Sequence, residues 1–105
     1  MHLIYSTFPS KVEAHKIAEK LVQEKLVACV NIFEGMNSIY EWDNNIKQEI
    51  EIPAFFKVSD KGLQQAMEVI KILHPYECPC VISIRIEKGN QDYLKWVENS
   101  VKVDY

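Results

Sequence analysis

Residues 46–58 have the sequence IKQEIEIPAFFKV, in which side chains alternate between two sets. One set is Ile46, Gln48, Ile50, Ile52, Ala54, Phe56 and Val58, and the other is Lys47, Glu49, Glu51, Pro53, Phe55 and Lys57. Alternation with a period of two is typical of a β-strand whose two faces meet different surroundings. Pro53 has no backbone N–H to give to a neighbouring strand, so we expect it at a bulge or on an unpaired edge.

A second strand, predicted over residues 38–42, precedes this one and would form a hairpin with it. The intervening Asp43-Asn44-Asn45 is a turn signal, because Asn and Asp tolerate a left-handed backbone. Residues 46–58 would span about 43 Å, whereas a helix over residues 11–26 would span only about 24 Å. The hairpin therefore extends about 20 Å beyond the helix that could cover it.

The outer part of this hairpin is not polar. It carries Ile39, Tyr40, Trp42 and Ile46. A lone hairpin that exposes such side chains would be marginally stable and prone to aggregate. We therefore predict a homo-oligomer in which another copy covers the ribbon. The alternative is that Pro53 bends the ribbon back onto its own core, since bulges redirect strands.

The flanking segments predict further elements. Strands are expected over Leu3–Phe8, Val27–Phe33 and Cys80–Ile86, the last with Cys80, Ile82, Ile84 and Ile86 on one face. A capping box of Ser10 and Glu13 starts a helix that runs to about Leu26. Its apolar stripe is Ala14, Ile17, Ala18, Leu21 and Val22. Asp60 can cap a second helix with the stripe Leu63, Ala66, Met67, Ile70 and Leu73, which ends where Pro75 pushes His74 out of helical geometry. A short helix around residues 93–97 closes the chain.

The order βαββαβ plus a short C-terminal helix predicts the fold class. Two right-handed βαβ crossovers interleave into an antiparallel sheet with both long helices on one face. We therefore expect an α/β (α+β) protein, a ferredoxin-like plait with a long central hairpin, as a single domain over residues 1–105. The other face of the sheet would start out uncovered.

Composition narrows the classes of partner. Fifteen acidic against twelve basic side chains give a net charge of −3, which argues against nucleic acid as a partner. No apolar segment approaches the roughly 20 residues of a membrane span, and the start does not resemble a signal peptide. The three cysteines, Cys29, Cys78 and Cys80, cannot all pair, so we expect free thiols in a reducing cytoplasm.

Motifs of common enzymes are missing. The chain has no nucleophile elbow, no His-Glu-x-x-His and no Walker loop, and its three glycines are isolated. We therefore expect a protein that acts by binding and assembly, and not an enzyme.

The densest polar group is HPYECPC, residues 74–80. Imidazole, carboxylate and thiol groups together can hold a soft or borderline metal such as copper or zinc, with His74, Glu77 and Cys78 as candidate ligands. Alternatively, Cys80 is the first buried residue of the last strand and Cys78 is incidental, while His74 interacts with the helix dipole. Glu49 and Glu51 could likewise bind a cation or pair with basic side chains. Those candidate basic partners are Lys47, Lys57 and Arg85.

Several motifs in order resemble the CutA family of divalent-cation tolerance proteins. They are ACVNI (28–32), SIYxW (38–42), ExE (49–51), Lys57, HPYExP (74–79) and YLxW (93–96). The resemblance covers essentially the whole chain and implies a ferredoxin-like subunit in a homotrimer that exchanges its hairpins. It also implies an association with copper and other divalent metals, and a similarity to trimeric PII-type signalling proteins. The copper ligands described for some members correspond here to Ser6, Leu73 and His74.

Two main functions follow as hypotheses. In the first, a trimeric metal-responsive protein binds Cu²⁺ or another divalent cation through His74, Glu77 and Cys78. In the second, a PII-like signalling trimer binds a small molecule or a protein in a cleft between subunits. That cleft would be lined by Cys29, Tyr40, Trp42, Glu49, Glu51, Lys57 and Tyr76. A third possibility is a purely structural scaffold, because a fold alone does not determine function.

Overall fold

The computed structural model describes residues 1–102 and has the predicted element order. Its strands are β1 (His2–Phe8), β2 (Cys29–Ile32), β3 (Met36–Trp42), β4 (Asn45–Val58) and β5 (Val81–Arg85). Its helices are α1 (Lys11–Gln23), α2 (Leu63–Leu73) and α3 (Gln91–Ser100). The sheet has the antiparallel order β2-β4-β1-β5, and β3 pairs with the outer half of β4. The predicted ferredoxin-like plait is confirmed; the predicted domain, residues 1–105, ends three residues beyond the described ones.

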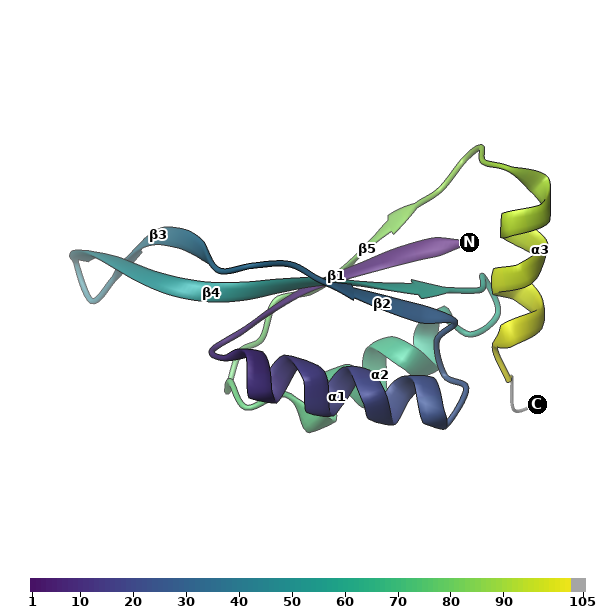
Figure 1. Cartoon of the computed structure of the whole chain (residues 1–105). Coiled ribbons are helices and arrows are strands. Elements are labelled where there is room, and N and C mark those ends of the chain that lie inside the picture. The colour runs from purple at the N-terminus through teal and green to yellow at the C-terminus, as the bar shows by residue number, and fades with distance from the viewer. Residues whose placement is uncertain (103–105) are drawn as a thin grey trace.

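Both long helices cover the same face of the sheet (Figure 1). The core between them consists of apolar side chains with almost no exposed surface, among them Ile4, Phe8, Leu21, Phe56 and Ile70. Burying one side chain of this size stabilises the fold by about 1.5–3 kcal/mol. On β4 one of the two alternating sets is buried from Ile52 to Val58, which agrees with a strand whose faces meet different surroundings.

Helix α1 begins as predicted but ends earlier. The Ser10 hydroxyl accepts a hydrogen bond from the Glu13 N–H, whereas the helix stops at Gln23 instead of Leu26. Lys25 adopts φ 59°, and the Leu26 and Lys25 N–H groups bond the carbonyls of Leu21 and Val22. This is a Schellman motif, which usually has glycine at the left-handed position. A lysine there gives no sequence signal. Val22, predicted in the buried stripe, lies within the helix but is exposed.

The start of α2 also differs from the prediction. Its N-cap is Gly62, and the Gly62 N–H donates to the buried hydroxyl of Ser59. Asp60 is not the cap, because its carboxylate lies 2.8 Å from the amine of Met1 and 2.9 Å from His2 Nδ1. At the other end the helix stops before His74, whose extended backbone precedes Pro75 as predicted.

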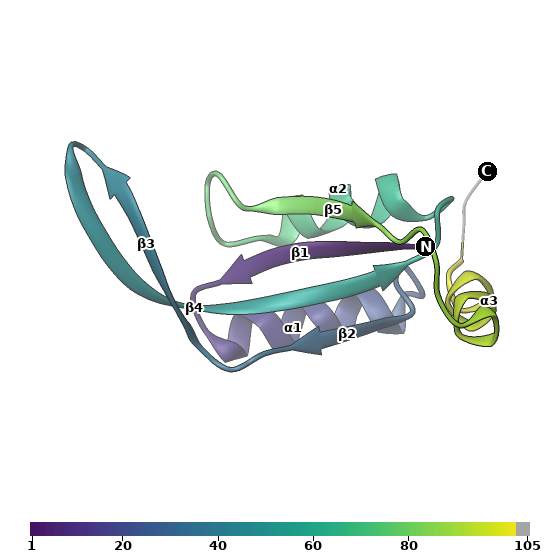
Figure 2. The ribbon, with the colours of Figure 1, turned by 90° about the horizontal axis from the view of Figure 1, so that it is seen from above.

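The hairpin of β3 and β4, here called the arm, projects past the helices (Figures 1 and 2). Its turn is Asp43-Asn44, with φ 51° and 64°, the geometry of a tight two-residue hairpin turn. The molecule measures 45 × 26 × 22 Å. The alternative in which the ribbon folds back onto its own core is therefore wrong.

Pro53 lies where β4 changes partners. The pairing with β3 ends at Glu51 and the pairing with β2 begins at Ala54. The Pro53 carbonyl accepts a hydrogen bond from the Phe33 N–H, so it faces the edge of β4 that pairs with β2 and β3. In an antiparallel strand the nitrogen of a residue faces the same edge as its carbonyl. The missing N–H thus falls at the interruption, which agrees with the expected unpaired position.

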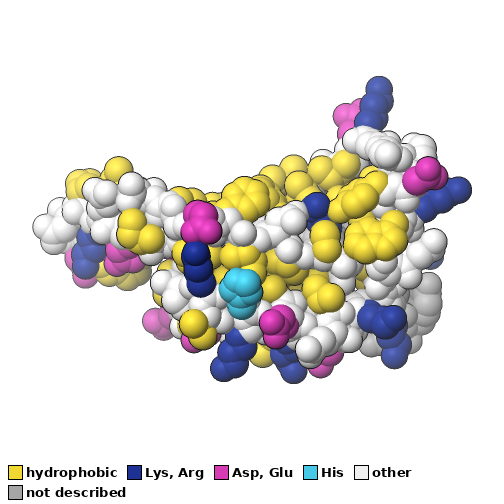
Figure 3. Space-filling model, viewed as in Figure 1, with side chains coloured by type: hydrophobic (Ala, Val, Ile, Leu, Met, Phe, Trp, Pro, Cys, Tyr) yellow, Lys and Arg dark blue, Asp and Glu magenta, His cyan; other side chains and the backbone are white. Residues whose placement is uncertain are grey.

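The second face of the sheet, here called the open face, is covered by neither α1 nor α2. Apolar side chains are spread along the sheet and out along the arm (Figure 3). Ile82 and Ile84 of β5 are about half exposed on the open face. Cys80 is only half-buried just before β5, so the prediction that it begins a buried strand is wrong. None of the helices within residues 1–102 is long and apolar enough to cross a membrane.

Candidate functional site

A groove of about 820 Å³ lies between the arm and the loop after α2. The arm contributes Tyr40, Trp42, Lys47, Glu49 and Glu51, and the loop contributes Pro75, Tyr76, Glu77 and Cys78. The alternation of β4 places Lys47, Glu49 and Glu51 on one face, and their partners across the hairpin include Tyr40. The groove therefore exists because a two-faced strand extends beyond the helices and a proline-stiffened loop stands beside it.

The loop is anchored by His74. Its ring is buried and stacks on Phe8 with centroids 4.7 Å apart. Nε2 lies 2.7 Å from the Thr7 carbonyl, and Nδ1 lies 3.1 Å from the Tyr76 N–H. A carbonyl only accepts and an N–H only donates, so these contacts assign the proton to Nε2 of a neutral ring. Burial lowers the pKa of His74, against smaller opposing effects of Thr7, Glu51 and Glu13.

Phenols bind the two carboxylates of β4, Glu49 and Glu51. Tyr76 donates to Glu51 at 3.0 Å; burial, then this bond, raises the pKa of Tyr76. A hydrogen bond with Glu49 is the main cause that raises the pKa of Tyr40. The expectation that Glu49 and Glu51 pair with basic side chains is thus replaced by phenol partners. With Glu77 the groove carries three carboxylates against one amine, that of Lys47, which favours cations.

The three predicted metal ligands do not come together. Within residues 1–102, no group of three or more His, Cys, Asp or Glu side chains is arranged to hold a metal ion. Glu77 and Cys78 line the groove, but both ring nitrogens of His74 are already engaged. The expectation of His74 as a ligand is corrected on this ground. Ser6, at another position of the family's copper ligands, is fully buried.

A second polar group lies on the open face, at the far end of β4. Cys29 and Lys57 are direct partners across β2 and β4. The Cys29 Sγ lies 3.7 Å from the Tyr93 hydroxyl, and the Lys57 Nζ lies 5.3 Å from the centre of the Tyr93 ring. The structure therefore divides the predicted cleft residues: Tyr40, Trp42, Glu49, Glu51 and Tyr76 line the groove, whereas Cys29 and Lys57 do not.

Sequence reasoning did not assign Tyr93 to a site. Tyr93 and Trp96 are one turn apart on α3, with ring centroids at 5.6 Å. Their spacing indicates a shared helix face, but no local signal shows that α3 brings Tyr93 next to β2 and β4. Two residues that line the groove, Lys47 and Pro75, were also not predicted as site residues. The alternation of β4 and the HPYE motif contain them and could have indicated them.

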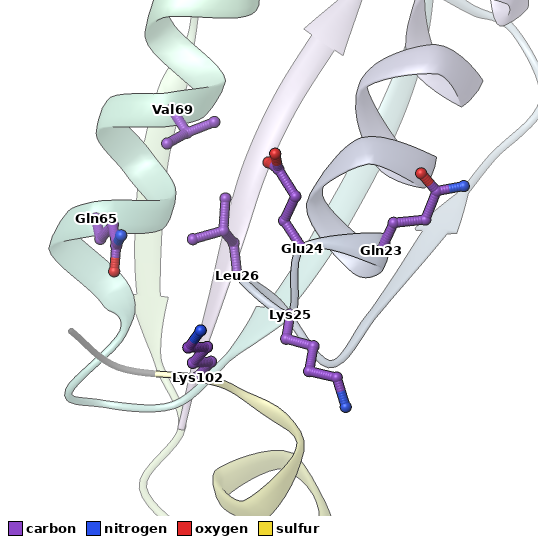
Figure 4. Close-up of a pocket in the computed structure, with 7 residues that line it drawn as sticks. All are labelled: Gln23, Glu24, Lys25, Leu26, Gln65, Val69 and Lys102. Carbon is purple, nitrogen blue, oxygen red and sulfur yellow. The ribbon is translucent and has the colours of Figure 1, made fainter.

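A different hollow, of about 600 Å³, lies between the two long helices (Figure 4). Its lining includes Leu26 and Val69, together with Glu24, Lys25 and Lys102. None of the predicted site residues lies in it, so the groove under the arm remains the candidate site.

Fold and groove together define a class: a ferredoxin-like α/β protein that presents an acidic, aromatic groove beside a long exposed hairpin. The family model of the CutA1 divalent ion tolerance protein matches residues 2–100. The chain belongs to this family.

Relatives and solved structures agree. The divalent-cation tolerance protein CutA of Thermotoga maritima is 38% identical over 96% of this chain and 99% of its own length. A crystal structure of CutA1 from Pyrococcus horikoshii superposes with a TM-score of 0.91 at 34% identity, covering 97% of this chain and 99% of that one. A structure described as the PII-like protein CutA from Nostoc sp. PCC 7120 gives 0.92 at 30% identity, covering 99% and 100%.

Proposed function

We propose that the protein is a homotrimer that serves divalent-cation tolerance by binding, without catalysis, and that its groove is the binding site. The observation that carries this proposal is the bare apolar side of the arm. Ile39, Ile46 and Ile50 share that side by register and are each more than 60% exposed. Covering one such side chain contributes about 1.5–3 kcal/mol, so a second copy is strongly favoured as cover.

The division of the predicted cleft residues supports the same proposal. The groove side of the arm is acidic and aromatic, while the open face carries the ammonium of Lys57 beside Cys29 and Tyr93. Opposite charges and two exposed apolar surfaces are complementary between copies. Contact of the acidic groove side of one copy with the Lys57 group of another would unite both groups, and the family resemblance implies three copies.

For the cation, we propose Glu77 and Cys78 as ligands, completed by groups of a neighbouring copy. A thiol and a carboxylate fit copper or zinc better than magnesium or calcium. His74 is left out because both of its ring nitrogens are engaged; its role is to hold the loop that carries these two ligands.

Assembly is tested by analytical ultracentrifugation. Wild type is expected to sediment as a trimer at low micromolar concentration, and Ile46→Lys to dissociate. Ile72→Lys is the matched control, because Ile72 on α2 is 76% exposed and Ile46 is 73% exposed. A wild type with the mass of a single chain, or equal behaviour of the two variants, would contradict the proposal.

Cation binding is tested by calorimetric titration of the assembled protein with Cu²⁺ and Zn²⁺. Glu77→Gln and Cys78→Ser are each expected to weaken binding about tenfold or more. Glu68→Gln, which removes the same charge from the exposed side of α2, should bind like wild type. Equal affinities in all four proteins would remove the metal role.

The groove also supports a second candidate function, recognition of a planar polar small molecule. Tyr40 and Trp42 offer aromatic faces, and Lys47 offers an ammonium, a combination that suits such ligands. Thermal-shift screening separates the two functions, since bound ligand raises the melting temperature by mass action. A hit that is lost in Lys47→Met but kept in Cys78→Ser would favour the small molecule.

We also propose that the protein works in the cytoplasm. All three cysteines are free, which suits a reducing compartment. One structural relative, from Archaeoglobus fulgidus, is described as periplasmic. Fractionation of cells that express the protein at its native level tests the compartment, and recovery with periplasmic markers would contradict it.

A further inference from the structure

The hollow between the two long helices is bounded by three parts of the chain: the end of α1, the first turns of α2 and the segment after α3 (Figure 4). Backbone hydrogen bonds fix these walls. The Lys102 N–H donates to the Lys25 carbonyl at 2.8 Å, and the Leu26 N–H donates to the Leu21 carbonyl at 2.9 Å. The hollow lies on the helical side of the sheet (Figure 1), so copies that cover the arm and the open face leave it accessible.

The hollow combines an apolar base with two opposite charges. Leu26 is only 9% exposed, and Val69 is half-buried. Figure 4 shows the Glu24 side chain extending into the space between the helices and the Lys102 side chain directed toward Leu26, whereas Lys25 points away. An apolar base with a few polar groups around it, in a volume of about 600 Å³, is the usual composition of a small-molecule site.

The two charges of the hollow are not paired with each other. The Glu24 carboxylate lies 3.5 Å from the ammonium of Lys20, one turn away on α1, and both side chains are 51% exposed. Such an exposed pair contributes little to stability, so an incoming cation can share the carboxylate. Among residues 1–102, no ion pair or side-chain hydrogen bond engages the Lys102 ammonium. A carboxylate and an ammonium that line one hollow without meeting leave space for a ligand that carries both charges.

We propose that this hollow binds a free α-amino acid with an apolar side chain. The ligand's carboxylate binds the ammonium of Lys102, and its own ammonium binds the Glu24 carboxylate. Its side chain lies on Leu26 and Val69. An α-amino acid carries both charges on one carbon beside its side chain, which suits a small hollow with this lining. The inference goes beyond cation tolerance, because the hollow shares no residue with the groove.

The test is a titration of the isotope-labelled, assembled protein with L-leucine, followed by two-dimensional NMR. The backbone amide signals of residues 23–26, 65–69 and 102 are expected to move and to saturate, while signals of the groove stay in place. Two analogues separate the charges, since isocaproate lacks the ammonium of leucine and isoamylamine lacks its carboxylate. Each analogue should bind about fivefold or more weakly than leucine, because charge-assisted hydrogen bonds are the strong ones.

Variants assign each charge to its partner. Glu24→Gln should weaken the binding of leucine and isoamylamine about fivefold or more and leave isocaproate unchanged. Lys102→Met should weaken leucine and isocaproate to the same degree and leave isoamylamine unchanged. Glu87→Gln and Lys88→Met are the matched controls, because both residues are exposed and lie outside the hollow. The crossed pattern excludes a general loss of fold, which would weaken all three ligands together.

Three results would overturn the proposal: no shifts at the hollow, equal affinity for leucine and its two analogues, or unchanged leucine binding in both Glu24→Gln and Lys102→Met. The other proposals fail independently of this one. Ile46→Lys, which should dissociate the assembly, and Glu77→Gln, which should weaken cation binding, are both expected to bind leucine like wild type.

Discussion

At the scale of single residues, His74 shows how a side chain with metal-binding chemistry can serve the fold. Its ring joins β1 to the groove loop through Thr7 and Tyr76 and packs on Phe8. A protonated ring would carry a hydrogen on Nδ1, which would face the Tyr76 N–H. The loop that presents Glu77 and Cys78 therefore depends on a neutral His74.

This dependence predicts a loss of stability in mild acid. The pKa of His74 is lowered, mainly by burial, whereas in the unfolded chain the ring titrates at about 6.5. Below that pH the unfolded state binds more protons, so acid favours unfolding. The stabilisation is complete above about pH 6.5 and falls as the pH drops, by at most about 1.4 kcal/mol per unit.

Urea unfolding at about pH 7 and about pH 5 measures this loss. His74→Gln should be less stable than wild type at the higher pH and should lose less between the two. An equal loss in both proteins would show that another group is responsible.

Two buried serines give a matched pair at the same scale. Ser6 Oγ has no hydrogen-bond partner among the described residues, whereas Ser59 Oγ accepts from the Gly62 N–H. An unpaired buried hydroxyl costs about 1–3 kcal/mol. Ser6→Ala is therefore expected to raise the free energy of unfolding by about 1 kcal/mol, and Ser59→Ala to lower it by a similar amount. Denaturant titration measures both, and changes of the same sign would contradict the assignment.

At the scale of elements, the contact between the start of α2 and the segment after α3, here called the joint, requires that Gly62 has no side chain. A Cβ added to Gly62 would lie 2.7 Å from Val101 Cγ1 and 3.0 Å from Ser59 Oγ. Val101 and Ser59 are both buried, so neither can move without disturbing the core. Close packing at the N-terminus of α2 thus requires glycine for space.

Gly62→Ala is therefore expected to lower the free energy of unfolding by about 1–3 kcal/mol. Gly89→Ala is the control, because the nearest atoms that its Cβ would meet are Leu94 side-chain atoms at 3.3 Å or more. Thermal unfolding of both variants measures the difference. A Gly62→Ala protein as stable as Gly89→Ala would show that the joint can relax.

At the scale of the whole molecule, the arm and the open face leave more apolar surface uncovered than one chain can bury. Such surfaces mark association sites. If copies cover one another, folding and assembly are linked, and the melting temperature rises with protein concentration. Wild type should show this rise in calorimetric scans, and Ile46→Lys should show none. A concentration-independent wild type would mean that the arm stays bare.

Much of this architecture could be predicted because local periodicity determines which side of an element faces the core. The alternation through residues 46–58 correctly predicted a long strand, and one of its two sets is buried from Ile52 to Val58. The errors fell at positions where the local sequence pattern is absent or misleading. Lys25 takes the left-handed position expected of glycine, and Asp60 binds Met1 instead of capping α2.

The sequence by itself determined the elements, their pairing and an arm too long for its own helices, because side-chain period and strand length are local properties. Only the tertiary structure decided which polar residues meet. It engaged both nitrogens of His74 with Thr7 and Tyr76, and it placed Cys29 and Lys57 beside Tyr93 instead of in the groove. Those contacts join residues far apart in the chain, so they depend on how the sheet and α3 pack, which no local pattern encodes.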